Sequence, residues 1–286
     1  MPDLLHGRAP AKVNLVLEVL GKRSDGYHEI DTVLQELELA DEVTIEPAGA
    51  TCVEVFGTYA AGTPVDERNL AVRAFMRAAE KSNFGRGALI RLQKNIPPAG
   101  GLGGGASDAA AVLKLVRAWM PGLSVGDVLE IANSIGSDEA YFLTGGTARA
   151  TGRGESVTPL PPLPVHDVVL FIPPESIEQK TPRMFAALGR TPFDSGAVAR
   201  HFASQPQANF GSSDVFNAFE RVAFELFPWL AALWEDLETR IGEPVRLAGA
   251  GPTLFWIGPF GKGVDVASRA NGTNCTVIPT RTAAPR

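Results

Sequence analysis

Hydrophobic and polar residues alternate along residues 12–20, and this period of two predicts a β-strand. Lys12 and Asn14 fall together on one face, so the strand can present an ammonium group and an amide to one ligand. A solvated strand face would show the same pattern, and the alternation alone does not separate the two interpretations. The opposite, apolar face carries Val13, Leu15, Leu17 and Val19.

Short polar turns divide the apolar runs that follow into three further predicted strands. The expected strands are residues 31–39, 42–46 and 51–56, an arrangement typical of a meander in a mixed or antiparallel sheet. Tyr27 and His28 come directly after a turn of composition GKRSDG. An aromatic residue in this place is most often a lid on the core, and a lone histidine is most often solvated.

Apolar positions at helical spacing predict a helix from Asn69, a good N-cap residue, to about Lys81. A strand is expected at residues 88–94, and after a glycine-rich loop a second helix at residues 107–120. Ser124 is expected to cap a third helix, residues 125–134.

The glycine-rich loop between residues 97 and 107 has the composition of an anion-binding loop. Glycine lets the backbone take positive φ and lets an oxyanion approach it, while the first N–H groups of the following helix point into the loop. Ser107 suits the N-cap, where its hydroxyl could cap the helix, contact a phosphate or reach a metal ion. The glycines are Gly100, Gly101, Gly103, Gly104 and Gly105.

Spacing separates this loop from other glycine loops. A Walker A loop needs lysine after its last glycine, whereas Ala106 follows Gly105. The dinucleotide fingerprint is matched by Gly101, Gly103 and Ala106, but it requires a second strand with an acidic residue about 20 residues later, and a helical pattern stands there instead. A flexible linker would not run directly into a capped helix.

Four prolines between residues 159 and 164 predict a linker and a domain boundary, which gives domains 1–157 and 158–286. In the second domain a strand at residues 165–172 and mostly helical residues 209–234 are expected. A strand, glycine turn and strand follow at 247–255, then a helix at 264–270 and a last strand at 276–279. This order suggests a ferredoxin-like α+β half.

Composition excludes several classes of function. The net charge of −6 and the pI near 5.3 leave no basic footprint for nucleic acid or an anionic membrane. The N-terminal residues lack the pattern of a signal peptide, and the longest apolar stretches are too short to span a membrane, so a soluble cytoplasmic protein is expected. Two distant cysteines and four scattered histidines argue against a zinc site.

Three motifs resemble those of the GHMP kinases, a superfamily of small-molecule kinases that includes galactokinase, homoserine kinase, mevalonate kinase and phosphomevalonate kinase. PPAGGLGGGASDAA at residues 97–110 resembles their second motif, and LAGAGPTLF at 247–255 their third. PAKVNLVLEVLGKRSDGYHEI at 10–30 resembles the first motif, in the form found in the branch that phosphorylates a cytidine diphosphate-linked methylerythritol in the non-mevalonate isoprenoid pathway. The resemblance implies a two-domain α+β GHMP kinase fold, with an N-terminal mixed-sheet ATP-binding domain and a C-terminal ferredoxin-like domain.

The resemblance also implies the ligands and the residues that bind them. ATP would be the phosphoryl donor, with Mg²⁺ bridging its phosphates, and the protein would work as a monomer or weak homodimer. Asp138 would accept the proton of the acceptor hydroxyl, and Lys12 would keep that carboxylate ionised. The ATP-binding residues would be Asn69, Pro98, Gly100, Gly101, Leu102, Gly103, Gly104, Gly105, Ala106, Ser107 and Asp108. The small-molecule substrate would contact Asn14, Tyr27, His28, Thr181, Pro182, Phe185, Gly249 and Gly251.

Some positions depart from the superfamily's pattern. Glu139 and Ala140 replace an apolar residue and a proline after Asp138, and Ala218 replaces an aspartate. Ala248 and Ala250 stand where serines are common, so two hydroxyl contacts are expected to be lost while the glycine turn keeps its backbone role.

Two alternative functions stay open. The first is another GHMP kinase, acting on mevalonate, phosphomevalonate or homoserine. A nucleotide-binding regulator without turnover is the second.

Overall fold

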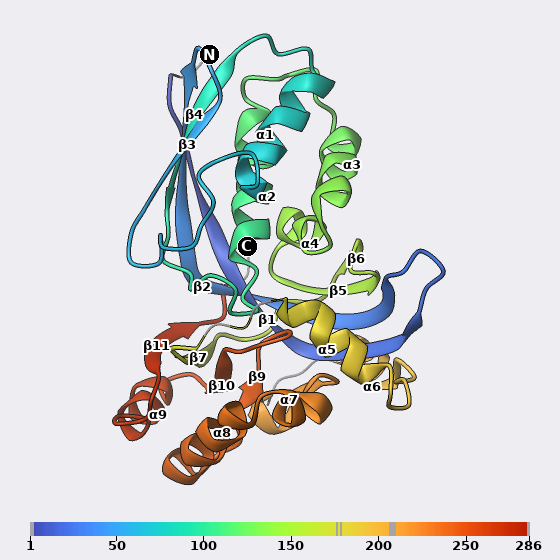
Figure 1. Ribbon diagram of the computed structural model, residues 1–286, viewed down its shortest axis with the longest axis vertical. Helices are drawn as coiled ribbons and strands as arrows, with labels where there is room; N and C mark the ends of the chain where they lie inside the picture. Colours follow the sequence, from blue (N-terminus) through green and yellow to red (C-terminus); the bar gives the residue numbers. More distant parts are fainter. Residues whose placement is uncertain (1–2, 176, 178, 206–209, 285–286) are drawn as a thin grey trace. The chain divides into compact units, whose positions relative to one another are not determined.

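The structure is a computed structural model, and it describes residues 3–175, 177, 179–205 and 210–284 (Figure 1). The chain forms two compact units. Unit 1 comprises residues 1–11, 39–98 and 103–145, and unit 2 comprises residues 12–38, 99–102 and 146–286. Each unit therefore contains several chain segments, so the units do not follow the single boundary at residue 157 that the proline-rich stretch suggests. That boundary stays a prediction.

Unit 1 combines a mixed sheet with four helices. Residues 42–48 of β2 (His28–Ala48) pair antiparallel with β4 (Gly87–Gln93), and β3 (Cys52–Phe56) pairs with β4 in parallel. The helices are α1 (Leu70–Lys81), α2 (Gly104–Val116), α3 (Val125–Ile135) and α4 (Glu139–Thr144). As expected, Asn69 caps α1, and Ser124 caps α3 within a capping box.

Two expectations for this region are wrong. Residues 31–39 and 42–46 belong to one strand of 21 residues rather than two, and β3 pairs with β4 instead of continuing a meander from β2. The polar residue that suggested a turn, Asp41, is fully buried, and its carboxylate accepts hydrogen bonds from the backbone N–H groups of Asn95 and Ile96. A buried polar residue whose hydrogen bonds are satisfied can lie inside a strand, so β2 continues through Asp41.

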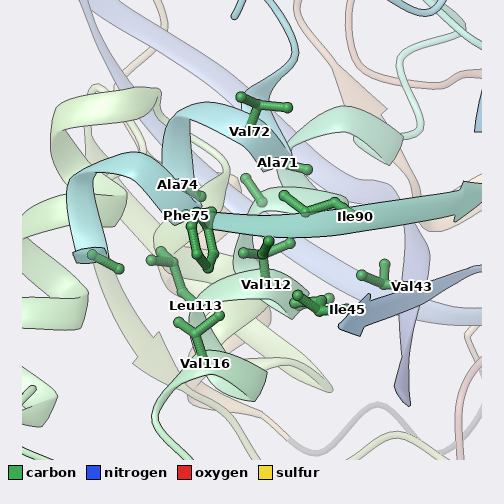
Figure 2. Packing of buried hydrophobic residues seen from close by; sticks show 14 of the residues in the cluster. Val43, Ile45, Ala71, Val72, Ala74, Phe75, Ile90, Val112, Leu113 and Val116 are labelled. Carbon is green, nitrogen blue, oxygen red and sulfur yellow. The ribbon is translucent and has the colours of Figure 1, made fainter. Parts of the chain in front are cut away.

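The core of unit 1 is formed by apolar side chains of the sheet and of the helices packed on it. Figure 2 shows Phe75 of α1 and Val112 and Leu113 of α2 beside Ile45 and Ile90 of the strands. All five side chains are almost completely buried. This packing fixes α2, and with it the C-terminal end of the glycine loop.

Unit 2 contains two sheets. In the first, the order is β8-β1-β2-β5-β6, with β8 parallel to β1 and β5 antiparallel to both β2 and β6. The second is an antiparallel sheet in the order β11-β7-β10-β9. The strands are β1 (Leu5–Lys22), β5 (Thr147–Gly152), β6 (Ser156–Pro159), β7 (His166–Ile172), β8 (Phe216–Asn217), β9 (Arg246–Leu247), β10 (Leu254–Pro259) and β11 (Thr276–Arg281).

The helices of unit 2 pack apolar residues against these strands. Trp234 and Leu237 of α8 are buried in one cluster with Val169 of β7 and Trp256 of β10. The helices are α5 (Lys180–Leu188), α6 (Ala197–Ser204), α7 (Glu220–Leu226), α8 (Pro228–Ile241) and α9 (Gly263–Arg269), with a 3₁₀ turn at Ser212–Asp214.

The expectations for the second half of the chain are largely confirmed, and the α+β class with them. Residues 160–165 have no regular structure, as their prolines predict. The expected helical stretch 209–234 begins outside the described residues at Asn209, and within it residues 216–217 form a strand rather than a helix. None of the helices in the described part of the chain has both the length and the apolar composition that a membrane span needs.

Candidate active site

The glycine loop leads into α2 earlier than the sequence suggests. The helix begins at Gly104, and its N-cap is Gly103 with φ of 76°, so the expectation that Ser107 caps the helix is wrong. Ser107 lies inside the first turn, where its N–H donates to the carbonyl of Gly103 (2.9 Å). The N–H groups that precede this first intrahelical bond therefore belong to Gly104, Gly105 and Ala106. Small residues at these places leave the N–H groups open to an anion.

Two oxygen atoms near the start of α2 are buried without a hydrogen-bond partner. They are the hydroxyl oxygen of Ser107 and Oδ1 of Asp108. A buried oxygen without a partner is costly, so each is a candidate ligand atom for a cation or a phosphate-bound water. Across the described residues there is no group of three or more His, Cys, Asp or Glu side chains that could hold a metal. Mg²⁺ is usually held by one or two protein oxygens together with substrate phosphates and water, and the oxygens of Ser107 and Asp108 are of this kind.

A buried cluster of three charged residues, which the sequence analysis missed, supports this end of the loop. The Lys94 ammonium group at the end of β4 contacts Oδ2 of Asp41 and Oδ2 of Asp108 (2.5 Å for the latter). Asp41 also accepts hydrogen bonds from the N–H groups of Asn95 (2.5 Å) and Ile96 (2.8 Å). The cluster thus links the strand that enters the loop to the helix that leaves it. Burial raises the pKa of Asp108 to about 7, against the opposing charge of Lys94.

In unit 2, Lys12 and Asn14 do share one face of β1. The Lys12 ammonium group donates to Oδ1 of Asn14 (2.7 Å), whose amide nitrogen donates to the hydroxyl of Thr32 (2.8 Å) on β2. Both residues are only 4% exposed, so they do not form a solvated strand face. The backbone N–H of Lys12 donates to the carbonyl of Leu102 in the glycine loop (2.9 Å). Neighbouring strands thus hold the Lys12 amine beside the Asn14 amide.

The third motif forms a glycine turn, residues 248–253, between β9 and β10. Its ends are joined by a hydrogen bond from the Ala248 N–H to the carbonyl of Thr253 (2.9 Å). A Cβ atom on Gly249 would lie 3.3 Å from the Lys12 ammonium nitrogen, so this turn approaches Lys12 closely. Gly101 of the loop, with φ of +87°, passes so near the turn that its own Cβ would lie 2.0 Å from the Ala248 carbonyl oxygen. Close backbone approach therefore requires glycine at position 101, whereas at position 249 the positive φ of 55° favours glycine.

Asn217 and Glu220 hold the strand that enters this turn. The amide nitrogen of Asn217 donates to the carbonyl groups of Leu247 and Gly249, each at 2.8 Å. Oε1 of Glu220 accepts from the N–H of Leu247 (3.0 Å), and burial raises the pKa of Glu220 to about 7. Neither contact needs an aspartate at position 218, where the buried Ala218 packs in the apolar core of unit 2.

Rings from two distant segments of unit 2 meet beside the GKRSDG turn. The His28 ring stacks on Phe185 of α5 with 4.4 Å between centroids and 13° between planes. Tyr27 is 51% exposed, and its ring lies under the Arg153 guanidinium group at 5.0 Å. Tyr27 is therefore not a lid on the core. Burial, with the charge of Lys22, lowers the pKa of His28, so the ring is held in its neutral form near pH 7.

The remaining predicted residues lie in both units. Thr181 and Pro182 are exposed in the first turn of α5. Asn69 is buried, and both ends of its amide are used by the fold: Oδ1 accepts from the Ala71 N–H (2.9 Å), and Nδ2 donates to the Pro64 carbonyl (2.8 Å). Its capping role is confirmed, and its role near adenine stays a prediction.

Asp138 in unit 1 stands immediately before α4 and does not cap that helix with its side chain. Glu139, the first residue of α4, is 1% exposed, and burial raises its pKa to about 7, with a smaller contribution from the charge of Asp138. A Cβ atom on Gly136 would lie 2.5 Å from the Glu139 carboxylate, so this carboxylate turns back toward the residue that ends α3. Asp138 is thus the more exposed carboxylate of the two.

Comparisons with known proteins agree with the three motifs. The description "GHMP kinases N terminal domain" matches residues 69–146. The chain is 41% identical to a 4-diphosphocytidyl-2-C-methyl-D-erythritol kinase of Dehalococcoides mccartyi, over 86% of this chain and 87% of that protein. It is 37% identical to the enzyme of the same name from Pelotomaculum thermopropionicum, over 97% and 98%.

Solved structures show the same fold. The crystal structure of a 4-(cytidine 5'-diphospho)-2C-methyl-D-erythritol kinase matches with a TM-score of 0.77 and 30% identity, over 98% of this chain and all of that one. The mevalonate kinase of L. major matches with a TM-score of 0.70 at 13% identity, over 99% and 97%, which shows a shared fold only. The resemblance drawn from the motifs is confirmed. The chain belongs to the 4-diphosphocytidyl-2-C-methyl-D-erythritol kinases, a family of ATP-dependent enzymes within the GHMP kinase superfamily.

Proposed function

We propose that this kinase transfers the γ-phosphoryl group of ATP to the 2-hydroxyl group of 4-diphosphocytidyl-2-C-methyl-D-erythritol, in the non-mevalonate route to isoprenoids. The observation that carries the proposal is the stacking of His28 on Phe185 beside the GKRSDG turn. Rings from two segments, about 157 positions apart in the chain, come together where the family resemblance expects the cytosine. Mevalonate, phosphomevalonate and homoserine have no base for such a group of rings to recognise.

The cytosine would be recognised by the face and by the polar edge of the base. Tyr27, which is 51% exposed, supplies a ring face, and stacking of a base on an aromatic ring is worth about 1–3 kcal/mol. His28, neutral because burial lowers its pKa, offers one ring N–H donor and one acceptor to the base edge. A different base would leave the donor or the acceptor of the half-buried His28 ring unpaired, which favours cytosine.

Phosphoryl transfer depends mainly on positioning and on stabilising charge. The N–H groups of Gly104, Gly105 and Ala106 at the start of α2 would hold the ATP phosphates. Asp138 would accept the proton of the 2-hydroxyl, and Lys12, held by Asn14, would stabilise the negative charge that develops on the acceptor oxygen. Ser107 would supply an oxygen ligand to Mg²⁺, which neutralises phosphate charge when bound.

A substrate panel tests the proposal directly. Purified protein is incubated with ATP, Mg²⁺ and one acceptor at a time: the cytidylyl methylerythritol, mevalonate, phosphomevalonate or homoserine, and ADP release is followed. We expect kcat/KM for the cytidylyl compound to exceed that for each other acceptor by about 1,000-fold or more, because the pocket would be built to hydrogen-bond a base. Comparable turnover of mevalonate would refute the proposed substrate, and no turnover of any acceptor would indicate a nucleotide-binding regulator.

A further inference from the structure

Lys180, the first residue of α5, has a buried amine that the roles described above do not use. The residue is 9% exposed, and its ammonium group donates to two backbone carbonyls, those of Ala99 and Gly251. Ala99 belongs to the glycine loop and Gly251 to the glycine turn. One side chain thus ties together two backbone segments that are more than a hundred residues apart in the chain.

The backbone at both contact points is in an unfavourable conformation for ordinary residues. Ala99 has φ of 55°, one of few non-glycine residues with positive φ in the described chain, and Gly251 has φ of +77°. An alanine in the left-handed region is strained and persists only where its surroundings hold it. The hydrogen bond from Lys180 to the Ala99 carbonyl supplies such a hold.

We propose that Lys180 is a positioning residue, whose ammonium group ties the glycine loop at Ala99 to the glycine turn at Gly251 and so fixes the loop in the shape that receives the ATP phosphates. The proposal rests on the function proposed above for the loop. It adds a residue that none of the three sequence motifs contains.

The charge of Lys180 matters as well as its hydrogen bonds. Burial and the nearby charge of Lys12 lower the pKa of Lys180 to about 8, so the amine loses its charge within a range that assays can reach. Charge-assisted hydrogen bonds are about twice as strong as neutral ones, so the tie weakens as the pH rises through 8. Its surroundings carry these other charged groups: Lys12 on β1, Arg183 on α5 itself, and Glu220, Arg221 and Glu225 on α7, against which α5 packs.

Three of these charged groups contact other partners than Lys180. Glu220 accepts from the Leu247 N–H, Arg221 pairs with Asp194, and Arg183 lies over the ring of Phe227 at 4.9 Å. Among the residues that the structure describes, Lys12 is the charged group that shifts the pKa of Lys180. A second positive charge beside Lys12 also favours an anionic ligand in this part of unit 2.

The test compares Lys180→Met, Lys180→Arg and, as a matched control, Arg183→Met on the same helix. ATP affinity is measured by titration calorimetry without any acceptor, between pH 6.5 and 9.5. We expect Lys180→Met to weaken ATP binding about 10- to 100-fold at pH 7, the size of losing hydrogen bonds from a charged group. Arg183→Met should stay within about twofold of wild type, because Arg183 packs over the ring of Phe227, which belongs to neither the loop nor the turn.

The pH profile separates positioning from a general structural role. The ATP affinity of the wild type should fall above pH 8, and this fall should be absent in Lys180→Met. In Lys180→Arg the fall should move beyond the tested pH range, because arginine stays charged. Wild-type affinity in Lys180→Met would overturn the proposal. Equal losses of ATP affinity in Lys180→Met and Arg183→Met would also overturn it. If Lys180→Met does not fold, the proposal is overturned when the ATP affinity of Lys180→Arg falls at the same pH as that of wild type. Calorimetry needs no acceptor, so a wrong substrate assignment leaves this test intact.

Discussion

Replacing Gly101 by alanine adds one methyl group where the glycine loop passes the glycine turn, and we expect this change to destroy the ATP site. The new Cβ would lie 2.0 Å from the carbonyl oxygen of Ala248 and 2.9 Å from its carbonyl carbon. Both neighbours are backbone atoms, so no flexible side chain can move away. The loop and the turn would have to separate by about 1 Å to reach an acceptable contact.

The magnitude follows from two costs. Gly101 has φ of +87°, and an L-residue forced into the left-handed region loses about 1–2 kcal/mol. Forcing extra atoms into a packed site costs about 1–3 kcal/mol more. The sum, about 2–5 kcal/mol, is divided between lower stability and a displaced loop. If all of it appeared as stability, Tm would fall by roughly 4–20 °C, since 1 kcal/mol shifts Tm by about 2–4 °C in a chain of this size class.

Gly105→Ala provides a matched control from the same loop. Gly105 lies in α2 with ordinary helical φ, and the nearest atom to its new Cβ would be Cδ1 of Leu70 at 3.6 Å, an ordinary contact. Alanine is favoured over glycine inside a helix by about 1 kcal/mol, so this variant should be as stable as wild type or slightly more stable. Urea unfolding gives the stabilities, and calorimetry with ATP gives the affinity of Gly101→Ala. Unchanged ATP affinity in Gly101→Ala, or equal losses of stability in the two variants, would refute the reasoning.

Three further predictions concern single side chains of the proposed site. Asp138→Asn should keep the fold and ATP affinity but lower kcat by about 100-fold or more, the usual scale for a lost general base; near-native kcat would exclude that role. Glu139→Gln should make the free energy of unfolding depend less on pH. Burial raises the pKa of Glu139 to about 7, so the stability contributed by its protonated carboxyl group is full below pH 4.5 and is lost as the pH rises through 7. Urea unfolding at pH 5 and pH 8 should therefore show a smaller difference in stability for the variant than for wild type. Tyr27→Ala should raise KM for the cytidylyl substrate about 5- to 100-fold with KM for ATP and Tm nearly unchanged, because the ring is 51% exposed; equal losses for both substrates would contradict the cytosine role.

The sequence predicted well the features that depend on neighbouring residues, such as strand faces and helix caps. The alternation around Lys12 and Asn14 predicted a strand with both residues on one face, and the structure places their side chains 2.7 Å apart. Asn69 and Ser124 were predicted as N-caps from residue type and position alone, and both cap their helices. In each case the cause lies within a few residues, so the sequence contains all the information needed.

The errors arose where a distant partner decides the conformation. Asp41 falls in the short polar turn that was expected between residues 39 and 42, yet Lys94, 53 positions later, neutralises it and β2 continues through it. Ser107 was expected to cap α2, but Gly103 takes the left-handed conformation and starts the helix earlier. Residue type alone does not reveal either outcome, because both depend on packing that brings the loop and the strands together.

Lys180 shows how a buried donor could be sought from the sequence even though it could not be identified there. A glycine loop and a glycine turn that approach each other expose carbonyl groups that regular secondary structure does not satisfy, and each buried carbonyl needs a donor. Once the loop and the turn are known to approach each other, a donor for the Ala99 and Gly251 carbonyls can be sought, but the sequence does not say that Lys180 is that donor. Lys180 stands before a threonine and a proline in what resembles an exposed helix start, and only folding brings its amine to both carbonyls. The residues proposed to bind phosphate could be predicted from motifs because glycine and helix N–H groups act locally. The residue proposed to hold them in place acts across the fold, so it could be found only in the structure.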